Sequence, residues 1–151
     1  MKSLRIAFLV ALAFALASAA LASEESKNLE SAPPVKAYRA LLAAMKAGDY
    51  AAYKSWMVRD AGPRMDETTK QMGKDPKDVL SFLAMLTPPE VVVTGLEVDG
   101  DRAILHATGK LDGETNYGTI EMSEEDGQWR VGLQSWTTTK AGTGASATVV
   151  A

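Results

Sequence analysis

The stretch that decides the fold is Glu90–Thr138, EVVVTGLEVDGDRAILHATGKLDGETNYGTIEMSEEDGQWRVGLQSWTT. Three Asp-Gly pairs divide it into four runs that are rich in strand-forming residues. Asp-Gly between such runs is a strong hairpin signal, because the tight turn needs positive φ, which glycine adopts without strain. We therefore predict an antiparallel meander of four strands: Glu90–Asp99, Arg102–Leu111, Glu114–Ser123 and Gln128–Thr138.

The turns also predict which side chains share a face of the sheet, because a two-residue turn sets the register of its hairpin. We expect the core face to carry an aliphatic row of Leu96, Leu105, Ile120 and Leu133. The next row on this face has small side chains, namely Thr94, Ala107, Gly118 and Ser135. Such a row either lets a helix pack closely or forms the floor of a pocket between helices and sheet.

The opposite face of the predicted sheet carries aromatic residues. The same register places Tyr117 directly opposite Trp136, with Ile104 and His106 nearby. An outer sheet face is normally polar unless something covers it, and Tyr and Trp are enriched at protein interfaces. We therefore predict that these four residues form a contact with a second copy of the chain or with a protein partner. The alternative is a solvated face that tolerates a few apolar residues.

The residues before the sheet predict helices. Apolar residues recur at helical spacing after Pro33-Pro34, from Tyr50 and after Asp75-Pro76, while Gly62-Pro63 is expected to end the second helix. Asp66–Met72 predicts a short helical turn. The fold class is thus α+β, with N-terminal helices packed on one face of the four-stranded meander. Three aromatic residues on these helices are core residues that could also line a pocket: Tyr38, Tyr53 and Trp56.

Both ends of the chain differ from the domain in composition. Lys2 and Arg5 precede the apolar run Ile6–Ala17, and Ala20-Leu21-Ala22 offers small residues for a cleavage site. We predict an exported protein, periplasmic or extracellular, with an uncleaved membrane anchor as the alternative. The expected organisation is a signal peptide at 1–22, a loose leader at 23–32, the domain at 33–139 and a flexible tail at 140–151.

Composition narrows the classes of function. The 151 residues are 46% hydrophobic and 23% charged, which is ordinary for one globular domain. A net charge of −3 gives no electrostatic case for nucleic acid, and the absence of cysteine excludes disulfides and thiolate metal sites. The turn aspartates and dispersed methionines could suggest calcium or copper, but turn geometry and core packing explain them. We expect no cofactor, no metal, and no membrane contact after cleavage.

Two phrases carry a resemblance: AYRALLAAMKAGDY at Ala37–Tyr50 and DGQWRV at Asp126–Val131. With the order of helices followed by a meander, the chain resembles the nuclear transport factor two-like (cystatin-like, SnoaL-like) superfamily, especially its small secreted bacterial members. The resemblance implies a cone-like fold, in which a curved sheet wraps around helices, with a pocket and frequent dimerisation through the sheet. Here three helical segments precede all four strands, as in shorter members of the superfamily.

The resemblance leaves the function open, because the superfamily holds both enzymes and non-catalytic binders. We expect an exported non-enzymatic domain that binds a small apolar ligand or a protein partner. The alternative is a small isomerase or hydratase, with His106, the single histidine, or an acidic residue as base. The pairs that such enzymes use, Asp with His or Tyr with Asp, are not matched in the sequence.

Overall fold

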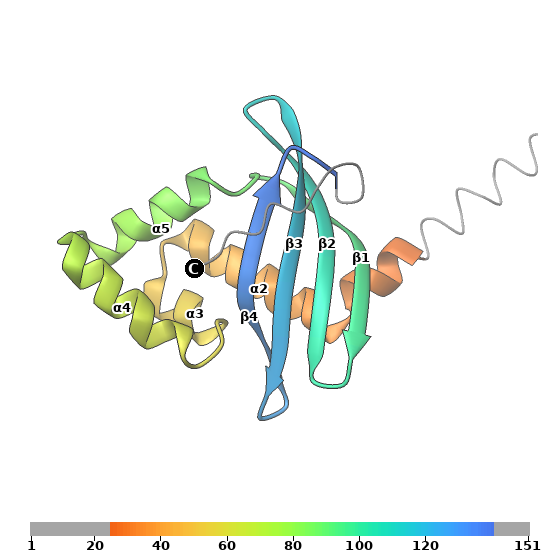
Figure 1. The fold of residues 1–151 in the computed structure, drawn as a ribbon, viewed down its shortest axis with the longest axis horizontal. Coiled ribbons are helices and arrows are strands. Elements are labelled where there is room, and N and C mark those ends of the chain that lie inside the picture. Colours follow the sequence, from red (N-terminus) through yellow and green to blue (C-terminus); the bar gives the residue numbers. More distant parts are fainter. Residues whose placement is uncertain (1–24, 141–151) are drawn as a thin grey trace, which may run out of the picture.

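The computed structural model describes residues 25–140 and has an α+β fold (Figure 1). The four strands form one open antiparallel sheet in the order β1-β2-β3-β4. The predicted signal peptide and nearly all of the predicted tail lie outside the described residues. Within residues 25–140, no helix is long and apolar enough to cross a membrane. The elements are α2 (Pro33–Ala47), α3 (Tyr50–Ser55), α4 (Ala61–Met72), α5 (Pro76–Met85), β1 (Val91–Asp99), β2 (Arg102–Leu111), β3 (Glu114–Glu125) and β4 (Gln128–Thr137).

The three predicted hairpin turns are confirmed. The residues that flank each two-residue turn are paired directly, as for Leu111 with Glu114 and Glu125 with Gln128. Asp112 and Asp126 both have φ of 52°, and the glycine after each also has positive φ. This is the backbone shape that Asp-Gly favours in tight hairpins, so the local sequence accounts for the meander.

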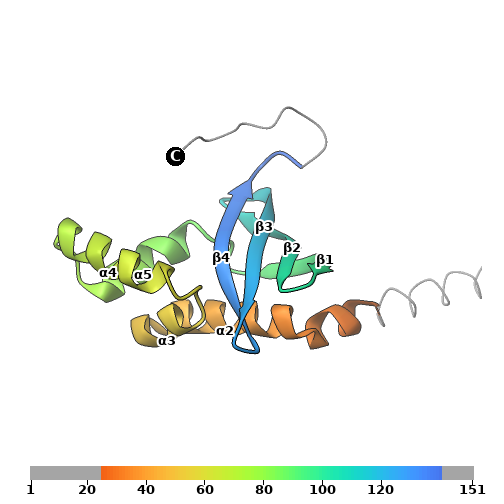
Figure 2. The same ribbon diagram turned by 60° about the horizontal axis from the view of Figure 1, so that its bottom comes forward.

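The core lies between α2 and the sheet. Figure 2 shows α2 passing across the sheet, while α4 and α5 stand to one side, next to β4. Both α2 and the middle strands contribute side chains with almost no exposure, and burying each such aliphatic side chain stabilises the fold by about 1.5–3 kcal/mol. The most buried large side chains include Val35, Tyr38, Leu41, Leu105 and Ile120. The α2 stripe and the Leu105–Ile120 pair were predicted and are confirmed.

The predicted register of β4 is correct only up to Val131. Val131 pairs with Met122 as predicted, but the next pair joins Leu133 to Glu121, so Gly132 is an extra residue in β4. Such a β-bulge moves every later side chain to the other face. Leu133 was predicted in the core; it instead points outward and is 58% exposed.

The bulge also separates the two aromatic residues that were predicted to face each other. Tyr117 pairs with Thr137, and Trp136 pairs with Gly118, so the predicted Tyr117–Trp136 pair is wrong. A Cβ on Gly118 would lie 2.8 Å from ring carbons of Trp136, so the indole lies directly over this glycine. The prediction that Ser135 lies in the small row is also wrong, because Ser135 is exposed. Trp136 fills the space above Gly118.

A second bulge shifts the start of β1. Val93 pairs with Ala107 and Gly95 pairs with His106, which leaves Thr94 as the extra residue. Val93 is buried and Thr94 is exposed, so the prediction that Thr94 lies on the core face is wrong. Of the four residues predicted for the small row, only Ala107 and Gly118 therefore remain in it. Val93 pairs with Ala107 on one side, and Trp136 pairs with Gly118 on the other.

The helices differ from the prediction around Gly62-Pro63. We expected these residues to end a helix, but they lie in the first turn of α4, where proline is tolerated because its missing N–H would have no partner there. α4 therefore extends over 12 residues rather than forming a short turn at Asp66–Met72. The predicted start of a helix at Asp75-Pro76 is confirmed, and Asp75 caps α5 by accepting a hydrogen bond from Lys77 N at 2.8 Å. The residues at 25–31, predicted as a loose leader, are helical.

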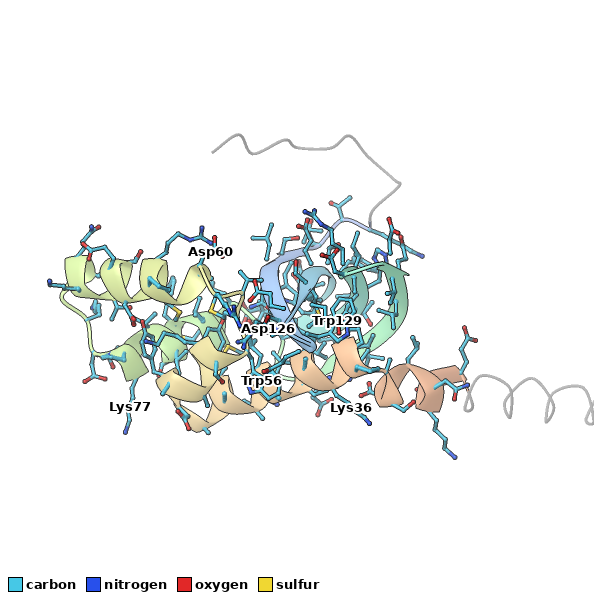
Figure 3. All side chains as sticks on the ribbon, turned by 90° about the horizontal axis from the view of Figure 1, so that it is seen from below. Lys36, Trp56, Asp60, Lys77, Asp126 and Trp129 are labelled. Atoms are coloured by element: carbon cyan, nitrogen blue, oxygen red, sulfur yellow. The ribbon has the colours of Figure 1, made fainter. Side chains whose placement is uncertain are left out.

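The segment after α3 fastens the helices to the sheet. Val58 N donates to Val131 O at 2.9 Å, and Val131 N donates to Trp56 O at 2.8 Å. Arg59 pairs with Asp126 in the β3–β4 turn. Figure 3 shows Trp56 and Asp126 close to the junction of the helices with the sheet. This junction places α4 and α5 beside the outer edge of β4.

Candidate binding cleft

A cleft of about 750 Å³ separates α4 and α5 from β4. Figure 1 shows the two helices beside this strand, on the side away from β3. The volume lies within the range of about 300–1,000 Å³ that is typical of small-molecule sites. The residues lining it are Tyr53, Met57, Arg64, Met65, Thr68, Met72, Lys74, Asp78, Val79, Phe82, Leu83, Val131, Gly132, Leu133 and Gln134. We call it the β4 cleft.

The apolar walls of the β4 cleft follow from helical spacing. Met65 and Met72 lie seven residues apart on α4 and so share one face of that helix. Val79, Phe82 and Leu83 are three and four residues apart on α5 and form a matching stripe. Both stripes line the cleft, so the walls that α4 and α5 contribute are mainly apolar.

Several large apolar side chains that line the cleft remain exposed to solvent. Met72 is 54% exposed, Phe82 is 55% exposed and Leu133 is 58% exposed, and all three line the cleft. Single exposed apolar residues are common on soluble proteins, but a contiguous group within a concave surface marks a place where something binds.

Polar contacts between α3 and α4 fix the position of α4, which forms one wall of the cleft. Lys54 Nζ contacts both carboxylate oxygens of Asp66, at 2.6 and 2.8 Å. This hydrogen bond holds the pKa of the Asp66 carboxyl below its usual value. Tyr50 Oη lies 3.1 Å from Thr69 Oγ1, and Lys54 Nζ is 4.8 Å from the centre of the Tyr50 ring. These contacts fix the α4 wall of the cleft to α3.

The β4 wall is held from behind by α2. Tyr38 Oη donates a hydrogen bond to Gln134 Oε1 at 3.1 Å, which orients a polar side chain of the lining. Burial raises the pKa of the Tyr38 phenol, so it remains a neutral donor. Burial also raises the pKa of Tyr53, which lines the cleft directly. Tyr38 therefore supports the β4 wall from α2, and Tyr53 contributes to the lining from α3.

Three charged residues also line the cleft, namely Arg64, Lys74 and Asp78. Arg64 Nη1 is paired with Asp60 Oδ2 at 2.7 Å, one turn earlier. Lys74 and Asp78 lie at the turn between α4 and α5 and at the start of α5. Among residues 25–140, no three His, Asp or Glu side chains gather closely enough to hold a metal ion. The lining therefore suits an apolar ligand that makes a few polar contacts.

The structure distributes the predicted pocket residues differently. Tyr53 lines the β4 cleft, and Tyr38 supports its wall. Trp56 packs against the core at the end of α3. The four predicted small-row residues form no pocket floor together: Thr94 and Ser135 are exposed, whereas Ala107 and Gly118 are buried.

The predicted interface residues are also divided. Ile104 is 36% exposed, and His106 Nε2 lies 2.7 Å from Glu97 Oε1 on the outer face. Tyr117 is half-buried on β3, while Trp136 packs against the core. His106 is therefore absent from the residues that line the β4 cleft.

Sequence reasoning missed the main lining residues, Met65, Phe82 and Leu133. The signal for Phe82 was the helical spacing of apolar residues after Asp75-Pro76, which was interpreted as a helix packed on the sheet. Met65 was missed because α4 was expected to begin after it, and Leu133 because the bulge reversed its direction.

Comparisons of the chain with protein-family models, with curated proteins and with solved structures gave no match.

Proposed function

We propose that this chain is an exported, non-enzymatic domain that binds a small apolar ligand, or the apolar part of a protein partner, in the β4 cleft. The observation that carries the proposal is the group of Met72, Phe82 and Leu133, which are large, apolar, more than half exposed and gathered in one concave site. A ligand there would remove these surfaces from water, which is the main source of affinity for apolar molecules.

The chemistry of the lining supports a ligand that is not rigidly specified. Three methionines, Met57, Met65 and Met72, line the cleft. Methionine has flexible, polarisable side chains that adapt to different shapes and is common at promiscuous binding surfaces. Gln134 and Thr68 offer polar contacts to orient the ligand.

The enzymatic alternative receives less support from the geometry. A small isomerase or hydratase would need an acid or base beside the ligand. His106 is on the outer face against Glu97, and Asp78 is the single carboxylate in the lining. We therefore base the proposal on binding.

The proposal also includes the cone-like fold and the export of the chain. The helices-then-meander order and the passage of α2 across the sheet support a resemblance to shorter nuclear transport factor two-like proteins (Figure 2). Export rests on the signal peptide that the first 22 residues predict. A partner or second copy on the outer sheet face would contact Ile104 and Tyr117 rather than Trp136.

The test is binding of a neutral apolar dye, N-phenyl-1-naphthylamine, measured by fluorescence titration. Phe82→Asn should weaken binding about 5- to 10-fold, because covering the exposed half of a phenylalanine is worth about 1–1.5 kcal/mol. Met85→Asn is the matched control, since Met85 lies on the same helix and is 72% exposed but does not line the cleft. Equal effects of the two variants, or no binding by the wild type, would refute the proposal.

A further inference from the structure

The outer edge of β4 is open next to the β4 cleft. β4 is the last strand of the sheet, so one of its edges has no neighbouring strand. Val131 on this edge pairs with the segment at Trp56–Val58. In the part of the chain that the structure describes, no backbone hydrogen bond joins this edge to another segment between Leu133 and Thr137. The open edge is therefore about five residues long.

Among the described residues, the edge beyond the bulge at Gly132 has few of the features that normally protect exposed strands. Soluble proteins protect their edges with lysine, proline, inward-pointing charges, β-bulges or a covering segment, and of these β4 has the bulge at Gly132. The sequence Leu133–Thr137 is LQSWT, which contains neither a charged residue nor proline. An unprotected edge with free backbone donors and acceptors is a template for pairing with another strand.

The chain already uses this edge for strand pairing at one position. The bridge between Met57 and Val131 is parallel, and its two hydrogen bonds are 2.8 and 2.9 Å long. Met57 and Val131 are also the lining residues where the cleft begins. The open edge begins after the bulged residue Gly132, which follows this bridge, so a segment placed there would extend an interaction that the fold itself makes.

We propose that the β4 cleft takes a single extended peptide segment of another protein, which adds to the outer edge of β4 and places alternate side chains against Met65, Met72 and Phe82. This inference rests on the proposed function and names the class of its ligand. Backbone pairing supplies affinity and the apolar walls select the side chains, as in other cases of strand addition.

The surroundings of the edge determine what kind of occupant fits. α4 and α5 stand beside β4, so a second sheet from another copy of the chain would meet these helices, whereas one strand needs a width of only about 4.8 Å (Figure 1). The edge carries no charge, the walls are mainly apolar, and the guanidinium of Arg64 on α4 is already paired with Asp60. The fitting segment is therefore uncharged with apolar residues at every second position. The other two charged lining residues, Lys74 and Asp78, lie in the turn between α4 and α5 and in the first turn of α5.

The test uses a capped hexapeptide that alternates valine and threonine, with its fully N-methylated analogue as the matched control. The analogue keeps every side chain but loses every N–H that could donate to β4. We expect the first peptide to bind at least tenfold more tightly in a titration with the full chain. It should also slow hydrogen exchange of those backbone amides between Leu133 and Thr137 that point away from β3, because these amides gain acceptors.

Each other outcome overturns the inference in a recognisable way. Equal binding of both peptides, or protection elsewhere, means that the cleft binds without strand addition and leaves the proposed function standing. The same follows if the naphthylamine dye binds and neither peptide does. Protection of these amides without peptide means that the edge is already occupied, by a second copy if the mass doubles and by the chain itself if it does not. If the protein binds neither the dye nor the peptides, the proposed function is overturned as well.

Discussion

Replacing Gly118 with alanine tests the position of Trp136, on which the corrected sheet register depends. The new Cβ would lie 2.8 Å from two ring carbons of Trp136 and 3.0 Å from a third. Ordinary contact between carbon atoms needs about 3.5–4 Å, so the indole or the strand must move by roughly 1 Å. Overpacking of this kind costs about 1–3 kcal/mol, which corresponds to a fall in Tm of roughly 4–12 °C for a domain of this size.

The sign of the effect separates the two possible registers. If β4 had no bulge, Gly118 would face Ser135, and Gly118→Ala would stabilise the strand by about 0.5–1 kcal/mol through lower backbone entropy in the unfolded chain. Thermal unfolding followed by circular dichroism measures the difference. Gly95→Ala is a control, because its Cβ would lie 3.5 Å from His106, which is ordinary contact. A Gly118→Ala protein as stable as the wild type would refute the account of Trp136.

A double-mutant cycle removes the remaining ambiguity. Trp136→Phe deletes the second ring of the indole, whose Nε1–H is buried without a hydrogen-bond partner among the described residues. The cost of Gly118→Ala should be smaller in the Trp136→Phe background, by about 0.5–2 kcal/mol. Additive effects would show that the two residues do not touch.

Three further predictions concern the framework of the cleft. Tyr38→Phe removes the hydrogen bond to Gln134 and should lower the free energy of unfolding by about 0.5–1.5 kcal/mol in urea titration; an unchanged value would mean that the bond is not made. Asp75→Ala removes the cap of α5 and should lower the free energy of unfolding by about 1 kcal/mol, measured in the same way; an unchanged value would mean that Asp75 does not cap the helix. The contact with Lys54 lowers the pKa of Asp66, so its stabilisation is present above the unfolded pKa of about 3.9 and is lost as the pH falls through the lower folded pKa. Asp66→Asn should therefore be less stable than wild type at neutral pH, and the difference should disappear in acid; a pH-independent difference would exclude this ion pair as its cause.

The parts of the fold that depend on local chemistry could be predicted from the sequence. Asp-Gly fixes the backbone of a tight turn within two residues, so the three hairpins and the pairing of Leu105 with Ile120 follow from it. The stripe on α2 follows from helical spacing, and the capping of α5 from Asp75.

The parts that depend on one unpaired residue could not be predicted. The bulges at Gly132 and Thr94 leave no distinct mark in the alternation of apolar and polar residues, yet each reverses the faces of the residues beyond it. The predicted row of small residues and the Tyr117–Trp136 pair both depended on a regular register. The β4 cleft depends in addition on the distance between α4 and β4, which arises from contacts between separate elements such as Lys54 with Asp66.

The most direct test of apolar binding in the β4 cleft is a titration of the protein with N-phenyl-1-naphthylamine, observed through ¹³C-labelled methionine methyl groups by NMR. The methionines supply their own controls, because Met57, Met65 and Met72 line the cleft. Met45 and Met122 are buried in the core, and Met85 is exposed elsewhere. Binding in the cleft predicts shifts for the first three methyl signals and none for the others. Shifts confined to Met85, or no shift at saturating dye, would contradict the account.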